Sequence, residues 1–195
     1  MGKGSKIPWC DDTVNISSGC DGCELWKLGI GGPCYAGNLQ ETRLSKAFPD
    51  KYAADFSEVR LIPGRMQSVA SSRDLTGQPR RSKPWLDNRP RHVFVNDLGD
   101  IFSDDVPFTY IDDEVMACAR GELHPNGATH RYLLLTKRPS RAVEFVDWYL
   151  ERHERLPRDV WFGASVTNQM TANARLAQLL KLRYRVFGIR LWVSC

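Results

Sequence analysis

The chain has 195 residues and a formal net charge of +4, which is enough for one domain with a sizeable core and only mildly favours an anionic partner. No apolar run approaches the ~20 residues that span a bilayer, and residues 1–9 lack the hydrophobic region of a signal peptide. We therefore expect a cytoplasmic protein that forms a single domain over residues 1–195 and has no membrane partner.

Four of the six cysteines lie within the first 34 residues, at Cys10, Cys20, Cys23 and Cys34. The segment 18–36, which holds three of them, is rich in glycine, so its backbone can bring sulfur atoms together. Clustered thiolates in a reducing compartment bind soft metals, chiefly zinc or iron–sulfur, which favours metal binding over disulfide pairing. Spacing alone favours zinc on four thiolates, with Cys10 as the fourth ligand.

Predicted strands and helices alternate along the chain. The strands lie near residues 13, 59, 92, 131, 160 and 190, and helices are expected over 35–47, over 108–120, from Pro139 onward, and after Asn168 as N-cap. Such alternation predicts parallel strands joined by right-handed helical crossovers, in an open α/β sheet or a β/α barrel. The last strand ends the chain, so we expect a truncated carboxyl terminus, with a partner or a missing segment covering that strand.

Polar residues follow most of the predicted strands. In a β/α barrel the functional groups gather at the carboxyl ends of the strands, so these residues are expected to share one site. They are the cysteines after the first strand, then Asn96, Asp97 and Asp100, then Lys137 and Arg138, and finally Ser165 and Asn168. Elsewhere, the basic segment 80–91 with Trp85 resembles a nucleic-acid face, although a solvated loop is the better explanation of its composition.

Several sequence blocks resemble, in the same order, those of phage and prophage proteins of unknown function that carry a three-cysteine motif and are related to the radical S-adenosylmethionine (SAM) enzymes. The blocks are Trp9 to Asn15 leading to Gly19-Cys20, then Cys34-Tyr35-Ala36, the stretch from His92 to Pro107, Leu135 to Pro139, Val160 to Gln169, and Trp192 to Cys195. Two features depart from the family pattern. Here the close pair Cys20 and Cys23 precedes the single cysteine that carries Tyr-Ala, and the block that usually follows Ser194-Cys195 is absent.

The resemblance implies a partial (β/α)6 barrel of the radical SAM type that lacks its C-terminal part. It also implies a [4Fe–4S] cluster with Cys20, Cys23 and Cys34 each on one iron, while the fourth iron chelates SAM. An electron from the cluster would cleave SAM to methionine and a 5′-deoxyadenosyl radical that takes hydrogen from an unknown substrate, and the enzyme would need an electron donor.

The same resemblance suggests how the strand-end residues would hold the cofactor. Lys137 or Arg138 would bind a carboxylate or phosphate, Asp97 or Asp100 the ribose hydroxyls, and Asn96 and Asn168 amide-sized groups, with Ser165 at the same edge. Two alternatives remain open at this point: a non-enzymatic, zinc-stabilised module that binds nucleic acid, and an inactive, shortened relative.

Overall fold

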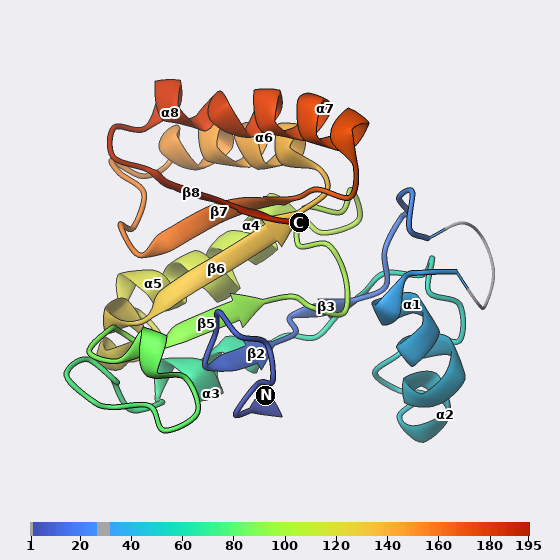
Figure 1. The fold of residues 1–195 in the computed structure, drawn as a ribbon, viewed down its shortest axis with the longest axis horizontal. Coiled ribbons are helices and arrows are strands. Elements are labelled where there is room, and N and C mark those ends of the chain that lie inside the picture. The colour runs from blue at the N-terminus through green and yellow to red at the C-terminus, as the bar shows by residue number, and fades with distance from the viewer. Residues whose placement is uncertain (1, 27–31) are drawn as a thin grey trace.

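The computed structural model describes residues 2–26 and 32–195 and has an α/β fold built on one mainly parallel sheet (Figure 1). The strand order is β1-β2-β5-β6-β7-β8, with β1 antiparallel to β2 and every other pair of neighbours parallel. The strands are β1 (Gly2–Lys3), β2 (Asp12–Val14), β5 (His92–Val95), β6 (Arg131–Thr136), β7 (Val160–Ser165) and β8 (Arg190–Ser194). The predicted α/β class with parallel strands is confirmed.

The strand predicted near residue 59 does not join this sheet, so the prediction of six parallel strands is wrong. The segment forms β4 (Arg60–Leu61), which pairs antiparallel with β3 (Ser17–Ser18) in a separate two-stranded sheet. Leu61 is exposed, whereas a strand inside a parallel sheet is covered on both faces. The main sheet therefore has five parallel strands, β2 and β5 to β8, and the antiparallel β1 beside β2.

The predicted helices lie where the sequence pattern puts them. A continuous helical run covers α1 (Tyr35–Leu39), the π-helical stretch Gln40–Leu44 and α2 (Ser45–Ala47), and a second covers α4 (Phe108–Ile111), the π-helical stretch Asp112–Met116 and α5 (Ala117–Arg120). The others are α3 (Arg65–Ala70), α6 (Pro139–Leu150), α7 (Gln169–Leu180), α8 (Leu182–Arg185) and the 3-10 turns Pro84–Leu86 and Pro125–Thr129. The Asn168 side chain accepts from the Thr171 N–H and caps α7 as predicted.

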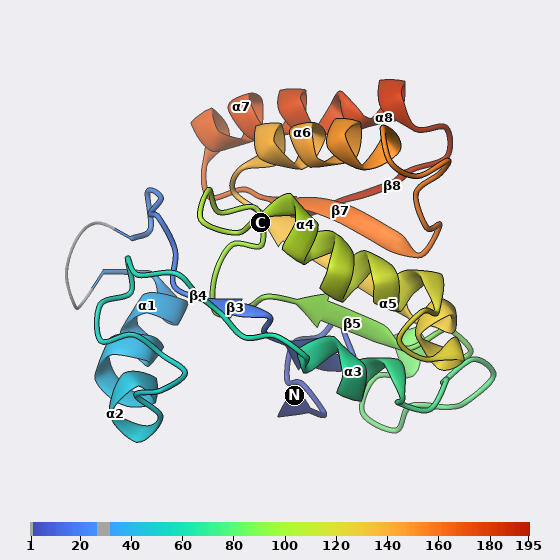
Figure 2. The same cartoon turned by 180° about the vertical axis from the view of Figure 1, so that it is seen from behind.

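One face of the sheet carries the main core. Val93, Val95, Leu134 and Phe162 point to this face and pack with buried residues of helices α3 to α8. Figure 2 shows α3, α4 and α5 lying across the sheet from this side. Because the strands follow one another in space as they do in sequence, every right-handed crossover places its helix on the same face.

The other face of the sheet is covered in part by the amino-terminal segment. The Trp9 ring lies 4.6 Å from the Phe94 ring and 4.8 Å from the Trp192 ring, and Cys10 is fully buried beside Phe94 and Leu133. Cys10 is therefore part of an apolar cluster on this face.

The basic segment 80–91 holds this amino-terminal segment in place. Arg80 is buried and pairs with Asp11 at 2.7 Å, and the Lys83 ammonium donates to the carbonyls of Ser5, Ile7 and Cys10. Arg80 and Lys83 are thus engaged inside the protein rather than presented to a partner. Within the described residues, no helix combines the length and apolar character needed to cross a membrane.

Candidate functional site

A cavity of about 160 Å³ lies beside the carboxyl ends of β5, β6 and β7, and we call it the cysteine cavity. In Figure 1 these strand ends point toward the side of the molecule where β3 and helices α1 and α2 lie. The predicted site residues that line the cavity are Cys20, Cys23, Cys34, Asn96, Asp97, Asp100, Lys137, Arg138 and Ser165. The structure thus brings together three thiols and six polar residues from four separate stretches of the chain.

Two predicted residues lie outside the cysteine cavity. Asn168 is exposed and is used as the N-cap of α7, where it completes a reciprocal pair of hydrogen bonds with Thr171. Cys10 does not line the cavity and packs in the apolar cluster beneath Trp9. A shared site for Cys10 and the other three cysteines would need the amino-terminal segment to move.

The three thiols of the cavity differ in environment, and none is in a disulfide. Cys20 is 8% exposed, and burial raises its pKa to about 11, so its sulfur is protonated at neutral pH until a metal replaces the proton. Cys34 caps α1, and its sulfur accepts from the Gly37 N–H at 3.4 Å, a position where the helix dipole favours negative charge. Cys23 is partly buried between them in the same cluster.

An apolar wall closes one side of the cavity. The Trp26 and Phe56 rings meet edge to face at 5.0 Å, and the Trp26 ring packs so closely on α1 that a Cβ at Gly37 would lie 2.5 Å from its Cε3 atom. The Trp26 indole N–H is buried and has no acceptor within the described residues. A buried donor without a partner is costly, so an acceptor placed next to the Trp26 N–H would be stabilising.

Backbone contacts fix the start of the cysteine segment. Gly19 has φ of +85°, and its N–H donates to the Leu98 carbonyl at 3.2 Å. A Cβ at Gly99 would lie 2.5 Å from the Gly19 carbonyl oxygen, so only glycine permits the two loops to approach this closely. Cys20 then donates its N–H to the Phe56 carbonyl at 2.8 Å.

Arg138 ties the cysteine segment to the end of β6. Its guanidinium lies 2.6 Å from the Asp21 carboxylate and donates to the Gly22 carbonyl at 2.9 Å. The same cation lies close enough to Cys20 to lower the pKa of that thiol against the larger effect of burial. The Arg138 guanidinium is therefore engaged by the protein's own cysteine segment.

A second ion pair, between Glu24 and Arg175, holds the segment to α7, and sequence reasoning did not identify it. Arg175 donates to both carboxylate oxygens of Glu24 at 2.9 and 2.6 Å, and it also bonds to the carbonyls of Lys137 and Ser165. The hydrogen bond from Arg175 is the largest cause that lowers the Glu24 pKa to about 2. The partners are 151 residues apart, and no local motif marks either of them.

Two of the predicted ligand-binding residues have their side chains engaged within the protein. Asn96, at φ of +75°, accepts from the Ser17 N–H at 3.0 Å and donates to the Ser17 hydroxyl at 2.7 Å. Asp100 accepts from the Thr136 hydroxyl at 2.6 Å and from the Lys137 N–H at 2.8 Å. These residues join the strand ends that form the cavity floor.

Three polar groups of the cavity keep free bonding capacity. The Lys137 ammonium has no ion-pair or hydrogen-bond partner within residues 2–26 and 32–195, and neither has the Ser165 hydroxyl. Asp97 accepts from the Asn15 amide at 2.6 Å through one oxygen, and burial raises its pKa. An unpaired cation that shares a cavity with a carboxylate and a hydroxyl suits a ligand that carries both an anionic group and hydroxyls.

The donor set determines which inorganic group would fit. Three thiols lining one cavity suit an iron–sulfur cluster, in which each thiolate binds a different iron, or zinc. Within the described residues, no three Cys, His, Asp or Glu side chains converge tightly enough to hold a single metal ion.

Comparison with known families gives one match. Residues 4–191 match the model of the family described as "Protein of unknown function (DUF5131)". The chain belongs to this family. Membership of an uncharacterised family is thereby confirmed, whereas a phage origin, a three-cysteine motif and a relation to the radical SAM enzymes stay predictions. Searches of curated proteins and of solved structures gave no significant match.

Proposed function

We propose that this protein binds a [4Fe–4S] cluster through Cys20, Cys23 and Cys34 and uses it, as radical SAM enzymes do, to cleave SAM reductively. The observation that carries the proposal is that these three thiols share one cavity with the unpaired Lys137 cation. Serial strand order with helices α3 to α8 on one face is the arrangement of a β/α barrel wall and supports the partial-barrel interpretation.

When bound, the cluster would supply the electron that cleaves the sulfonium of SAM. The residues of the chain bind, orient and shield. Lys137 would hold the SAM carboxylate, and Asp97 and Ser165 would hold its hydroxyl and amino groups. Asn96 and Asp100 keep the strand ends in register, since their side chains are engaged within the protein.

The apolar wall would exclude water from the reaction. Trp26 and Phe56 are almost fully buried and lie in the same cluster as the three cysteines. The Trp26 N–H, which has no acceptor within the described residues, would gain one from a cluster sulfide or thiolate. The sulfide and thiolate acceptors of a cluster would therefore favour its binding beside Trp26.

Anaerobic purification tests the proposal directly. We expect about four irons and four sulfides per chain, a brown colour, and formation of 5′-deoxyadenosine and methionine from SAM after addition of dithionite. Cys20→Ser, Cys23→Ser and Cys34→Ser should each lose iron, while the matched variants Cys10→Ser and Cys118→Ser should retain it. A colourless protein with one zinc per chain, or iron loss in the Cys10 variant, would refute the three-thiolate assignment.

A second variant separates cofactor binding from cluster binding. Lys137→Met should keep iron and sulfide content but weaken SAM binding about tenfold or more, because it removes the cation without a counter-charge. Arg141→Met provides a matched control, since the Arg141 guanidinium bonds to carbonyls and a carboxylate of the 103–106 loop, lies over the Phe108 ring and does not line the cavity. Equal SAM affinity in both variants would remove Lys137 from the binding site.

A further inference from the structure

The edge of the sheet opposite the cysteine cavity carries a concentration of arginines. Four of them stand at the starts of neighbouring strands: Arg89 shortly before β5, Arg131 first in β6, Arg158 shortly before β7, and Arg190 first in β8. Neighbouring strands lie ~4.8 Å apart, so these strand starts span about 14 Å along the sheet edge. With Arg155, which lies in the loop before β7, they form what we call the arginine edge.

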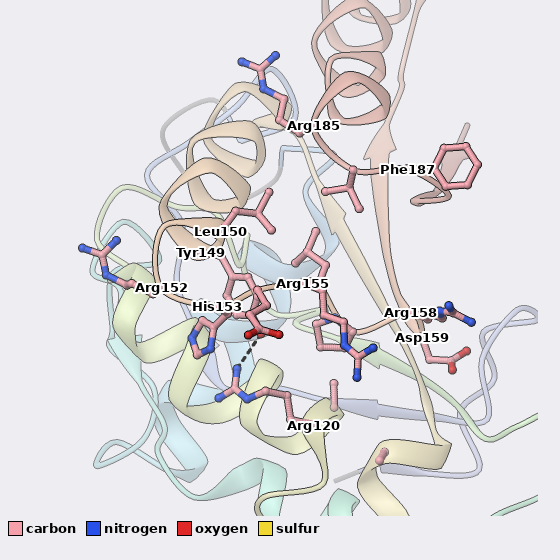
Figure 3. A pocket seen from close by; sticks show the side chains of 16 residues that line it. Arg120, Tyr149, Leu150, Arg152, His153, Arg155, Arg158, Asp159, Arg185 and Phe187 are labelled. Carbon is pink, nitrogen blue, oxygen red and sulfur yellow. Dashed lines mark hydrogen bonds between the residues drawn. The ribbon is translucent and has the colours of Figure 1, made fainter.

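A large groove adjoins this edge. It has a volume of about 1020 Å³ and is lined by five arginines and two carboxylates, those of Glu154 and Asp159 (Figure 3). In the view of Figure 3, Arg120, Arg155 and Arg158 occupy the lower part of the groove and Arg185 and Phe187 the upper part. The groove therefore holds an excess of positive charge comparable with that of the whole chain.

Part of this positive charge is neutralised within the protein. Arg120 pairs with Asp112 and Glu122, and Arg185 pairs with Asp147. Arg120 and Arg185 also end α5 and α8, where cations offset the helix dipole. Protein stability alone explains these arginines.

The arginine edge has no such explanation. Arg155, Arg158 and Arg190 are exposed and have no ion-pair or hydrogen-bond partner in the described part of the chain. Arg131 is partly shielded by Asp159 at 3.6 Å and lies over the Trp161 ring. Burial lowers the Arg131 pKa, Asp159 opposes this, and the positive charges of Arg89 and Arg190 add a smaller lowering. These cations are crowded because they stand at the starts of consecutive strands of one sheet. Crowded like charges repel unless an anion lies between them.

The chemistry of the edge indicates its ligand. Arginine forms bidentate hydrogen bonds with phosphate, and cations spread over several strands suit a polymer with regularly spaced charges better than one phosphate ion. Two aromatic rings are exposed in this region of the chain: Phe187, which lines the groove, and Tyr184, which precedes the lining residue Arg185 in α8. Exposed rings next to phosphate-binding cations are the features on which unpaired bases stack.

We propose that the arginine edge and its adjoining groove bind single-stranded nucleic acid, with the arginines on the phosphates and Phe187 stacked on a base. This surface lies at the amino ends of the strands, whereas the cysteine cavity lies at their carboxyl ends. A nucleic acid bound at this surface would therefore lie away from the cavity, and its binding would not require the proposed cluster.

The test compares two variants that lose the same charge. Arg155→Gln/Arg158→Gln/Arg190→Gln removes three exposed cations from the edge, and Arg43→Gln/Lys46→Gln/Lys51→Gln removes three exposed cations from the region of α1 and α2. Binding is measured by fluorescence anisotropy with a labelled 20-nucleotide oligothymidylate and with an RNA of equal length, from 50 to 200 mM salt. Circular dichroism melting confirms that both variants are folded.

We expect the edge variant to bind at least tenfold more weakly than the unmodified protein, with a salt slope smaller by about 2, since each lost phosphate contact on a single strand contributes ~0.7. The control variant should change affinity less than twofold. Phe187→Ala should weaken binding about fivefold or more and leave the salt slope unchanged.

Three results would overturn the proposal. Equal losses in the two triple variants would mean that only net charge matters. Equal or tighter binding of a duplex of the same length would exclude recognition of a single strand. Tighter binding of a polyglutamate peptide than of either oligonucleotide would identify an acidic protein segment as the ligand instead.

Discussion

Replacement of Glu24 by glutamine should loosen the cysteine segment without unfolding the protein. The carboxylate of Glu24 receives two hydrogen bonds from Arg175 and one from the Thr167 hydroxyl. Glutamine retains one acceptor oxygen, but in place of the second carboxylate oxygen it presents an N–H group to the Arg175 guanidinium. The segment should therefore open locally more often, while the parallel sheet stays intact.

The structure sets the size of this effect. A charge-assisted bidentate pair would be worth several kcal/mol if fully buried, but the Glu24 side chain is 30% exposed and solvent screens it, which leaves about 1–2 kcal/mol. Local opening should then increase about 5- to 30-fold. Cys20 is 8% exposed and reacts only when the segment opens, so its alkylation by iodoacetamide in metal-free protein should accelerate by the same factor.

Peptide mass spectrometry after timed alkylation at pH 8 measures the rate. Cys118 is fully buried in the main core and serves as the internal control, because its exposure requires global unfolding. The reasoning is refuted if Cys20 reacts at an unchanged rate, or if Cys118 accelerates in parallel with it.

The same pair predicts a dependence on pH. The Glu24 pKa is lowered from 4.5 to about 2, so the ion pair contributes fully above pH 4.5 and is lost as the pH falls toward 2. The protection factors of the amides around Cys20, which divide out the intrinsic exchange rate at each pH, should fall from pH 5 to pH 3 in the unmodified protein. The Glu24→Gln variant should have lower protection factors at pH 5 and a smaller change with pH, and parallel curves of protection factor against pH for the two proteins would contradict this assignment.

Three further changes test other parts of the structure. Gly37→Ala places a Cβ within 2.5 Å of the Trp26 ring and should cost about 1–3 kcal/mol in urea unfolding and displace that ring; an unchanged midpoint would show that the ring moves freely. Asn96→Ala loses two hydrogen bonds to Ser17 at a backbone φ of +75° and should cost about 3 kcal/mol, whereas a cost under about 1 kcal/mol would mean that water replaces the amide. The pKa of His92 is lowered from 6.5 to about 4, chiefly by burial, so its imidazole is neutral in the folded protein. The contribution of this neutral imidazole to the free energy of unfolding is therefore complete above pH 6.5 and is lost as the pH falls toward 4. The unfolding free energy should fall by roughly 3 kcal/mol between pH 6.5 and 4, and His92→Gln should flatten that slope.

Much of the fold follows from local sequence pattern. The apolar runs at residues 92–95, 131–136 and 160–165 became central parallel strands because such strands are covered on both faces. The run at Val59 to Ile62 has the same appearance, but its partner is the two-residue strand at Ser17, and Leu61 faces solvent. Strand propensity identified an extended segment there and could not identify the sheet that it joins.

The candidate site was predictable in position and less so in detail. Polar residues at the carboxyl ends of parallel strands meet by topology, which is why Cys20, Asp97 and Lys137 line one cavity. Whether a side chain is free or engaged depends on partners far away in sequence. Asn96 and Arg138 resemble ligand-binding residues in the sequence, yet both hold the protein's own backbone.

The contacts that fix the cysteine segment indicate when a cofactor could bind during folding. The segment is held by Leu98, Arg138 and Arg175, which lie in or beside the loops and helices that follow β5, β6 and β7. Closing loops of this length is entropically costly, so these contacts form only after the sheet and α7 have assembled. A zinc finger folds around its metal because its ligands are close in sequence and little else holds it together. Here the parallel sheet and its core exist independently of the thiols, so removal of an inorganic group should free the cysteine segment and leave the sheet folded.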